Sequence, residues 1–121
     1  MFAQIAASAM TNGCHIKFSP RTVNNMNQEL CRAIENVCLI ELRYSGYSRT
    51  VEPYAYGRDK KGDEILRCYQ ISGGSESGER AGWKLLKVRE IYSLHSTSSP
   101  FDIRREYKRG DSAMEYIFCQ Q

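Results

Sequence analysis

The sequence predicts a single, mainly β domain with α content (α+β), built as a small β-barrel with a helix over one opening. One amphipathic helical stripe is followed by four or five short β-type runs in quick succession, which is the pattern of a small barrel. The length of 121 residues is too short for two independent hydrophobic cores. We therefore expect one domain in three parts: an N-terminal arm (1–18), the helix and barrel (19–95), and a C-terminal extension packing on the barrel (96–121).

The composition is that of an ordinary folded protein. Hydrophobic residues make up 41% of the chain and charged residues 26%, which argues against intrinsic disorder. The formal charge of +3 arises from 17 basic and 14 acidic residues. An excess this small is a weak argument for an anionic partner unless the cations gather in space.

The cysteines predict a reduced, cytoplasmic protein. They are odd in number and include no C-x-x-C pair, whereas disulfide frameworks usually have an even count and zinc sites have closely spaced ligands. We therefore expect mostly buried thiols, no metal and no cofactor. The five are Cys14, Cys31, Cys38, Cys68 and Cys119.

The apolar stretch 1–10 has no Lys or Arg before it, which argues against an export signal. No run approaches the roughly 18 apolar residues that span a bilayer, so no membrane partner is expected. We interpret 1–18 as an arm that docks on the domain or on a second copy, which would make a homodimer.

A helix is expected from residue 19 to 37. Ser19 suits the N-cap and Pro20 the first helical position. Apolar residues then recur every three or four positions. The opposite face carries one cation, so the pattern indicates a helix that covers a core rather than one that reads DNA. The apolar stripe comprises Val23, Met26, Leu30, Ala33, Ile34 and Val37.

Two strands are expected at 38–44 and from residue 49, the second entering a hairpin that ends at residue 71. Pro53 cannot donate to a ladder, so it predicts an edge or a bulge. The polar stretch 58–63 contains a glycine and predicts the hairpin turn. In the returning arm, Leu66 and Cys68 alternate with Arg67 and Tyr69, which would bury one face and expose a cation beside a ring on the other.

The rest of the chain is harder to interpret. The glycine- and serine-rich stretch 72–82 predicts a loop, and it lacks the G-x-x-x-x-G-K-[ST] pattern of a phosphate-binding P-loop. Residues 83–94 predict further strand with a kink at 88–90. Residues 96–100 resemble a linker, and 116–118 suit a helix or a strand equally.

Between residues 33 and 101 the order of these segments resembles the WYL domain family. That resemblance implies a stand-alone bacterial regulatory domain with a five-stranded Sm-like (SH3-like) β-barrel that binds a nucleotide or single-stranded nucleic acid. The matching segments are Ala33-Ile34, Ile40–Tyr44, Arg49–Pro53, Leu66–Tyr69 and Lys84–Ile91.

We expect the ligand on a surface where cations lie among aromatic rings, since phosphates need the former and unstacked bases lie on the latter. Other interpretations stay open: Trp83 as a core residue, Arg67 paired with Glu52 or Glu41, and the basic run 104–109 as a solvated face. The candidate ligand-binding residues are Arg49, Arg67, Tyr69, Gln70, Trp83, Lys84, Lys87 and Arg89.

A second hypothesis is a module that binds an extended peptide or a regulatory protein partner through exposed rings of Tyr44, Tyr54, Tyr56 and Trp83. Catalysis is the weakest hypothesis. Cys68 or Cys38 could act with His15 or His95, but nothing in the sequence brings them together, and the carboxylates Asp59 and Asp63 fit turn chemistry. We therefore expect no enzyme activity.

Overall fold

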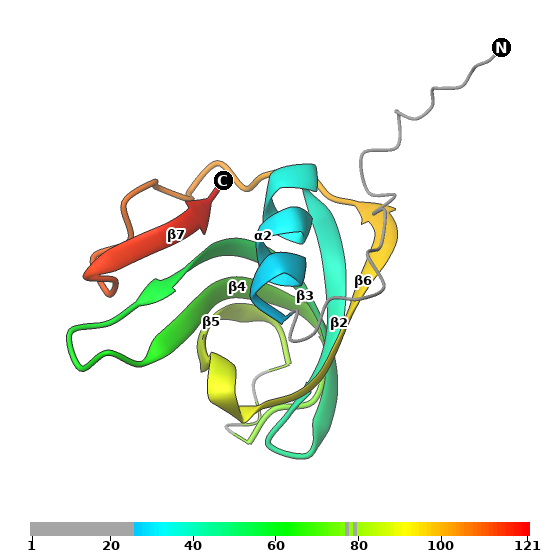
Figure 1. Ribbon diagram of the computed structural model, residues 1–121. Helices are drawn as coiled ribbons and strands as arrows, with labels where there is room; N and C mark the ends of the chain where they lie inside the picture. The colour runs from blue at the N-terminus through cyan, green and yellow to red at the C-terminus, as the bar shows by residue number, and fades with distance from the viewer. Residues whose placement is uncertain (1–25, 77, 79) are drawn as a thin grey trace, which may run out of the picture.

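The computed structural model describes residues 26–76, 78 and 80–121. Within these residues there are one α-helix and six strands (Figure 1). The predicted arm 1–18 and the predicted helix start at Ser19 lie outside the described residues. The elements are α2 (Met26–Asn36), β2 (Cys38–Tyr44), β3 (Tyr47–Arg58), β4 (Glu64–Gly73), β5 (Gly82–Lys87), the 3₁₀ turn η1 (Val88–Glu90), β6 (Ile91–Pro100) and β7 (Tyr116–Gln120).

The six strands form one antiparallel sheet in the order β5-β4-β3-β2-β6. The sixth strand, β7, pairs with the far end of β3, at 55–58. The predicted kink at 88–90 is confirmed as η1, which joins β5 to β6. No ladder joins these two strands in the described part of the chain, so the sheet is open between them. The mainly β fold with one helix is thus confirmed, with six paired strands.

Local chemistry explains the hairpins. Ser45 and Gly46 take positive φ angles of 53° and 80°, as a two-residue turn between antiparallel strands requires. The Asp59 carboxylate accepts the backbone N–H groups of Lys61 and Asp63 at 2.9 Å, confirming that this turn uses its acidic residue for turn chemistry. The β3–β4 register shifts between Pro53 and Ala55, so the bulge predicted at the proline is present.

The main core lies between α2 and the inner face of the sheet (Figure 1). Leu30 and Ile34 of the predicted apolar stripe are fully buried there, against Ile40, Val51 and Leu66 from three successive strands. This face of the helix is therefore confirmed as core-covering.

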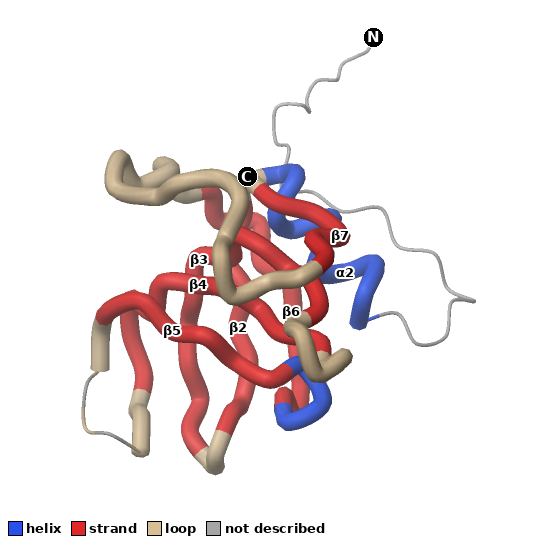
Figure 2. Tube along the Cα trace, turned by 90° about the vertical axis from the view of Figure 1, so that its left-hand side faces the viewer, coloured by secondary structure: helices blue, strands red, loops and turns tan. Residues whose placement is uncertain are grey.

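The opposite face of β3 is also covered, by the segment 101–115. Ala55 and Ile65 pack there with Met114 in a second apolar cluster. Residues 51–57 of β3 are consequently all buried. The segment is the long loop that precedes β7 (Figure 2), and it gives the sheet a second covering layer.

The linker predicted at 96–100 is wrong, because these residues continue β6. Ser96 pairs with Ile40 and Pro100 with Cys38, and the Thr97 hydroxyl donates a 2.8 Å hydrogen bond to the Leu39 carbonyl. A strand at a sheet edge has one face open to solvent, so hydroxyl side chains suit it as well as they suit a loop.

The prediction of reduced cysteines is wrong for three of the five, because Cys31, Cys38 and Cys119 are all disulfide-bonded. Cys31 of α2 and Cys119 of β7 form a disulfide across 88 residues. Sequence spacing gave no sign of it, because only folding brings the two together. Among the described residues, Cys68 is a free and buried thiol. In that same part of the chain, no helix is long and apolar enough to cross a bilayer.

Candidate ligand pocket

The outer face of β4 and β5 carries three of the predicted site residues. Tyr69 of β4 lies opposite Trp83 of β5 in the ladder, and Arg67 lies opposite Leu85. Arg67 and Tyr69 alternate with the fully buried Leu66 and Cys68, as the sequence pattern predicted. The cation and the rings therefore project from the side of the sheet that faces away from α2 and toward segment 101–115.

Aromatic rings cluster on this face. The Trp83 ring lies 4.9 Å from that of Tyr54 and 5.2 Å from that of Tyr69. Tyr107, from the covering segment, lies nearly parallel to Trp83 at 6.4 Å and 4.8 Å from Tyr54. Trp83 is thus half-buried among its own neighbours, and part of its area is used to hold the segment on the sheet.

Arg104 attaches the start of the segment. Its guanidinium donates two hydrogen bonds to the Glu52 carboxylate, at 2.8 and 3.2 Å, and lies 3.5 Å from the centroid of the Tyr69 ring. The Tyr54 hydroxyl donates to the same carboxylate at 3.0 Å. Burial, and then this bond to Glu52, raise the pKa of Tyr54 to about 12, although the bond from the Arg104 backbone N–H acts the other way.

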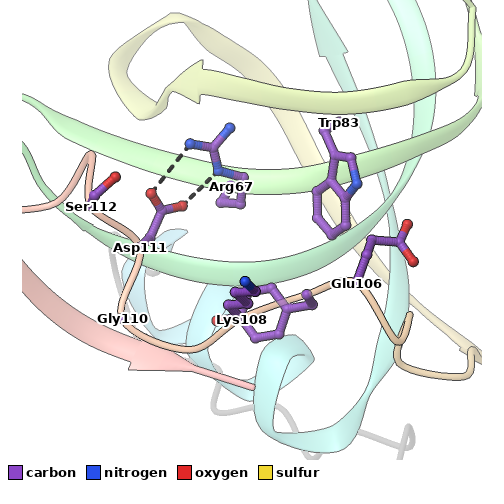
Figure 3. Close-up of a pocket in the computed structure, with 8 residues that line it drawn as sticks. Arg67, Trp83, Glu106, Lys108, Gly110, Asp111 and Ser112 are labelled. Atoms are coloured by element: carbon purple, nitrogen blue, oxygen red, sulfur yellow. Dashed lines mark hydrogen bonds and ion pairs between the residues drawn. The ribbon is translucent and has the colours of Figure 1, made fainter.

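Arg67 attaches the later part of the segment. Its Nε and Nη2 donate to the two carboxylate oxygens of Asp111, at 2.6 and 3.2 Å (Figure 3). Burial alone would raise the pKa of Asp111, but the bonds from Arg67 and from the Ala113 backbone N–H outweigh it and keep that pKa below its ordinary value. Arg67 thus pairs with neither Glu52 nor Glu41, the partners that the sequence had left open.

A pocket of about 330 Å³ remains between the sheet and the segment. The Trp83 side chain points from β5 toward the loop that carries Lys108, and the Arg67–Asp111 pair lies at one side (Figure 3). Among the described residues, Lys108 has no ion-pair partner. The lining residues are Arg67, Trp83, Glu106, Tyr107, Lys108, Gly110, Asp111 and Ser112.

The other predicted cations lie elsewhere. Lys87 and Arg89 both bind the carboxylate of Asp63 at the β3–β4 turn, at 3.3 and 2.9 Å. Lys84 contacts the Ser75 hydroxyl at 3.4 Å. None of the three lines the pocket, so the predicted cations do not converge on one concave surface.

Arg49 and Gln70 are inside the domain. Arg49 is 5% exposed and Gln70 is fully buried, and the two share a 3.3 Å hydrogen bond. Arg49 also donates to the Tyr44 carbonyl at 3.0 Å, and its guanidinium lies 5.1 Å from the centre of the Tyr44 ring. A guanidinium held this way is a structural group of the sheet interior.

The half of the pocket that comes from the segment was not predicted from the sequence. The basic run 104–109 around Tyr107 was the available signal, and one of the open interpretations made it a solvated face. The structure places Tyr107 and Lys108 over β4 and β5. The pairing of Asp111 with Arg67, 44 positions away in the sequence, had no sequence signal.

The aromatic surface predicted for peptide binding is not formed. Tyr54 and Tyr56 are buried, at 0% and 1% exposed, and Tyr44 is half-buried with its hydroxyl on Glu90. The Tyr54 ring lies against Trp83 and Tyr107 on the outer face, and the Tyr56 ring belongs to the main core.

Of the residues considered for catalysis, Cys38 is buried and disulfide-bonded, and His15 lies outside the described residues. Cys68 is fully buried, and burial raises the pKa of its thiol to about 12, which suppresses the thiolate that nucleophilic chemistry needs. His95 lies on the exposed side of β6. Over the described ranges, no three His, Cys, Asp or Glu side chains come close enough to bind a metal ion.

No protein-family model, curated protein or solved structure matches this chain. The WYL resemblance therefore stays a hypothesis, and the pocket is interpreted from its own chemistry.

Proposed function

We propose that this chain is a non-catalytic ligand-sensing domain that binds a nucleotide or a short single strand of nucleic acid in the pocket between β4, β5 and residues 106–112. The observation that carries this proposal is the joint presence of the Trp83 indole, Arg67 and Lys108 in one lining. Rings offer a stacking surface to a base and cations offer charge to a phosphate.

The size of the pocket suits this class of ligand. Its volume of about 330 Å³ lies at the lower end of the roughly 300–1,000 Å³ typical of small-molecule sites. A single nucleotide unit fits that range better than a folded partner would. A longer strand would extend past the rim, where Lys108 is exposed.

The resemblance to the WYL family and its Sm-like barrel belongs to this proposal. The order of the strands supports it, because β6 returns to pair with β2, the first strand of the set. A meander whose last strand meets its first is the arrangement from which small barrels are built.

The cytoplasmic location was expected because the cysteines were predicted to be reduced, and the disulfide removes that reason. A disulfide joining Cys31 to Cys119 is typical of oxidising compartments. We propose that the domain works in such a compartment.

A second candidate function is recognition of a polypeptide segment. One observation favours it: the outer face already holds part of its own chain, with Asp111 on Arg67 and Tyr107 beside Trp83. A partner segment with an acid and an aromatic residue would use the same contacts. Binding that does not weaken with added salt would favour this candidate over a nucleic acid.

Fluorescence titration tests the proposal, because Trp83 is the single tryptophan of the chain and lines the pocket. We expect nucleoside monophosphates and short oligonucleotides to change its emission saturably, with affinity that falls as salt rises. Lys108→Glu should weaken binding, and Lys60→Glu, an exposed change in the β3–β4 turn, should have little effect. An unchanged emission even at low salt would reject the proposal.

A further inference from the structure

The Arg67–Asp111 pair occupies the anion-binding position of the pocket. A carboxylate that receives two parallel N–H bonds uses the edge of the guanidinium that a phosphate would use. Asp111 holds that edge through Nε and Nη2 of Arg67. The side chain of Asp111 is 8% exposed and that of Arg67 is 26% exposed, so the pair lies at the wall of the pocket.

The charges of the lining cancel while this pair is closed. Arg67 and Lys108 are cations, and Glu106 and Asp111 are carboxylates. Lys108, which has no ion-pair partner in the described part of the chain, is available to an entering phosphate, but the Arg67 guanidinium already holds an anion. A ligand phosphate can engage the Arg67 edge only when Asp111 leaves it.

The chain around Asp111 is suited to such a movement. The ion pair between Arg104 and Glu52 holds one end of the segment. A 2.7 Å hydrogen bond from the Glu115 N–H to the Arg58 carbonyl holds the other end. Between them there is no helix or strand. The Gly110 N–H and the Arg109 guanidinium donate hydrogen bonds to the Gln120 side chain and the Gln121 carbonyl at exposed positions, so releasing the segment would also break these two surface bonds.

We propose that Asp111 is an internal competitor for the ligand's phosphate: binding transfers Arg67 from Asp111 to the phosphate and releases residues 105–112 from the sheet. This inference rests on the proposed function and adds its regulation. The sensed event would be the exchange of an intramolecular ion pair for an intermolecular one, and the released segment would be the output.

The experiment compares adenosine monophosphate with adenosine, using the emission of Trp83 in the intact chain. Asp111→Asn keeps the size of the side chain and removes its charge. We expect it to tighten binding of the monophosphate by on the order of tenfold and to leave binding of adenosine nearly unchanged. Asp102→Asn, an exposed change in the same segment, should alter neither.

Hydrogen exchange on the unmodified chain provides a measurement that does not depend on the stability of a variant. Amides of 105–112 should exchange faster when the monophosphate is bound, while those of β2 and β3 stay protected. Equal or weaker monophosphate binding by Asp111→Asn would overturn the inference and leave the proposed function standing. If neither nucleotide nor nucleoside binds either form, the proposed function itself fails.

Discussion

Gly57 of β3 lies directly against the backbone of Tyr116 in β7, so that a Cβ at residue 57 would overlap the Tyr116 carbonyl oxygen. The Met114 Sδ would lie 2.8 Å from the same Cβ. A side chain at residue 57 would therefore force the backbone of β7 away from β3 at this point of the ladder.

Gly57→Ala should consequently destabilise the domain by about 1–3 kcal/mol, as overpacking against a rigid neighbour does, and it should weaken hydrogen-exchange protection in β7. Chemical denaturation and amide exchange measure the two effects. Gly62→Ala is the matched control: its φ of +90° is unfavourable for alanine, but no atom lies within 4 Å. Its cost should be about 1 kcal/mol, with β7 unaffected. Equal losses in both variants would contradict the steric explanation.

Asp111→Asn should reduce stability at neutral pH by about 1–2 kcal/mol, because it removes charge-assisted hydrogen bonds to Arg67. The lowered pKa of Asp111 means that its contribution is present above about pH 4 and is lost as the pH falls through the folded-state value. The difference between the variant and the unmodified chain should therefore shrink in acid. Denaturant unfolding from pH 7 to pH 2 measures it, and a constant difference would contradict the assignment.

Replacing Cys31 and Cys119 together by alanine should destabilise the domain by about 2–5 kcal/mol, the usual cost of losing a native disulfide. The two cysteines are 88 positions apart in the sequence, so the unfolded chain gains conformational entropy when the disulfide is absent. Unfolding curves measure the loss. Peptide mapping of the unreduced protein should find the two cysteines cross-linked, and an alkylated Cys119 in that sample would contradict the pairing.

Cys68 should resist thiol reagents at pH 8 in the folded protein and react once denaturant unfolds it, because the buried thiol has a pKa of about 12. Because the folded-state pKa of Cys68 is raised, its protonated thiol favours the folded state. This contribution to stability is complete below the unfolded-state pKa of about 8.5 and is lost as the pH rises toward 12. Stability should decline over this alkaline range less steeply in Cys68→Ala. Full labelling of the folded protein at pH 8 would contradict its burial.

The fold was largely predictable from local sequence patterns. Alternation in 64–71 correctly assigned Leu66 and Cys68 to the core and Arg67 and Tyr69 to the outer face, and Pro53 correctly marked a bulge. Such patterns depend on near neighbours along the chain, which the sequence displays directly.

The pocket was predictable only on one side. Which face of β4 and β5 carries the cation and the rings follows from alternation, but what covers that face does not. Asp111 reaches Arg67, and Arg104 reaches Glu52, across 44 and 52 residues. Contacts of this range depend on the path of an irregular segment, for which no periodicity exists. For the same reason the pairing of Cys31 with Cys119 was not foreseen.

Residue 121 also sets when β3 can complete its hydrogen bonds during synthesis. The Gln121 N–H donates to the Tyr54 carbonyl at 2.8 Å, and its side-chain amide donates to the Pro53 carbonyl at 3.0 Å. These carbonyls belong to the middle strand of the sheet. Until residue 121 has emerged from the ribosome these two carbonyls have no partner from that residue, so the hydrogen bonding of the middle strand is completed only after segment 101–115 and β7 have been made.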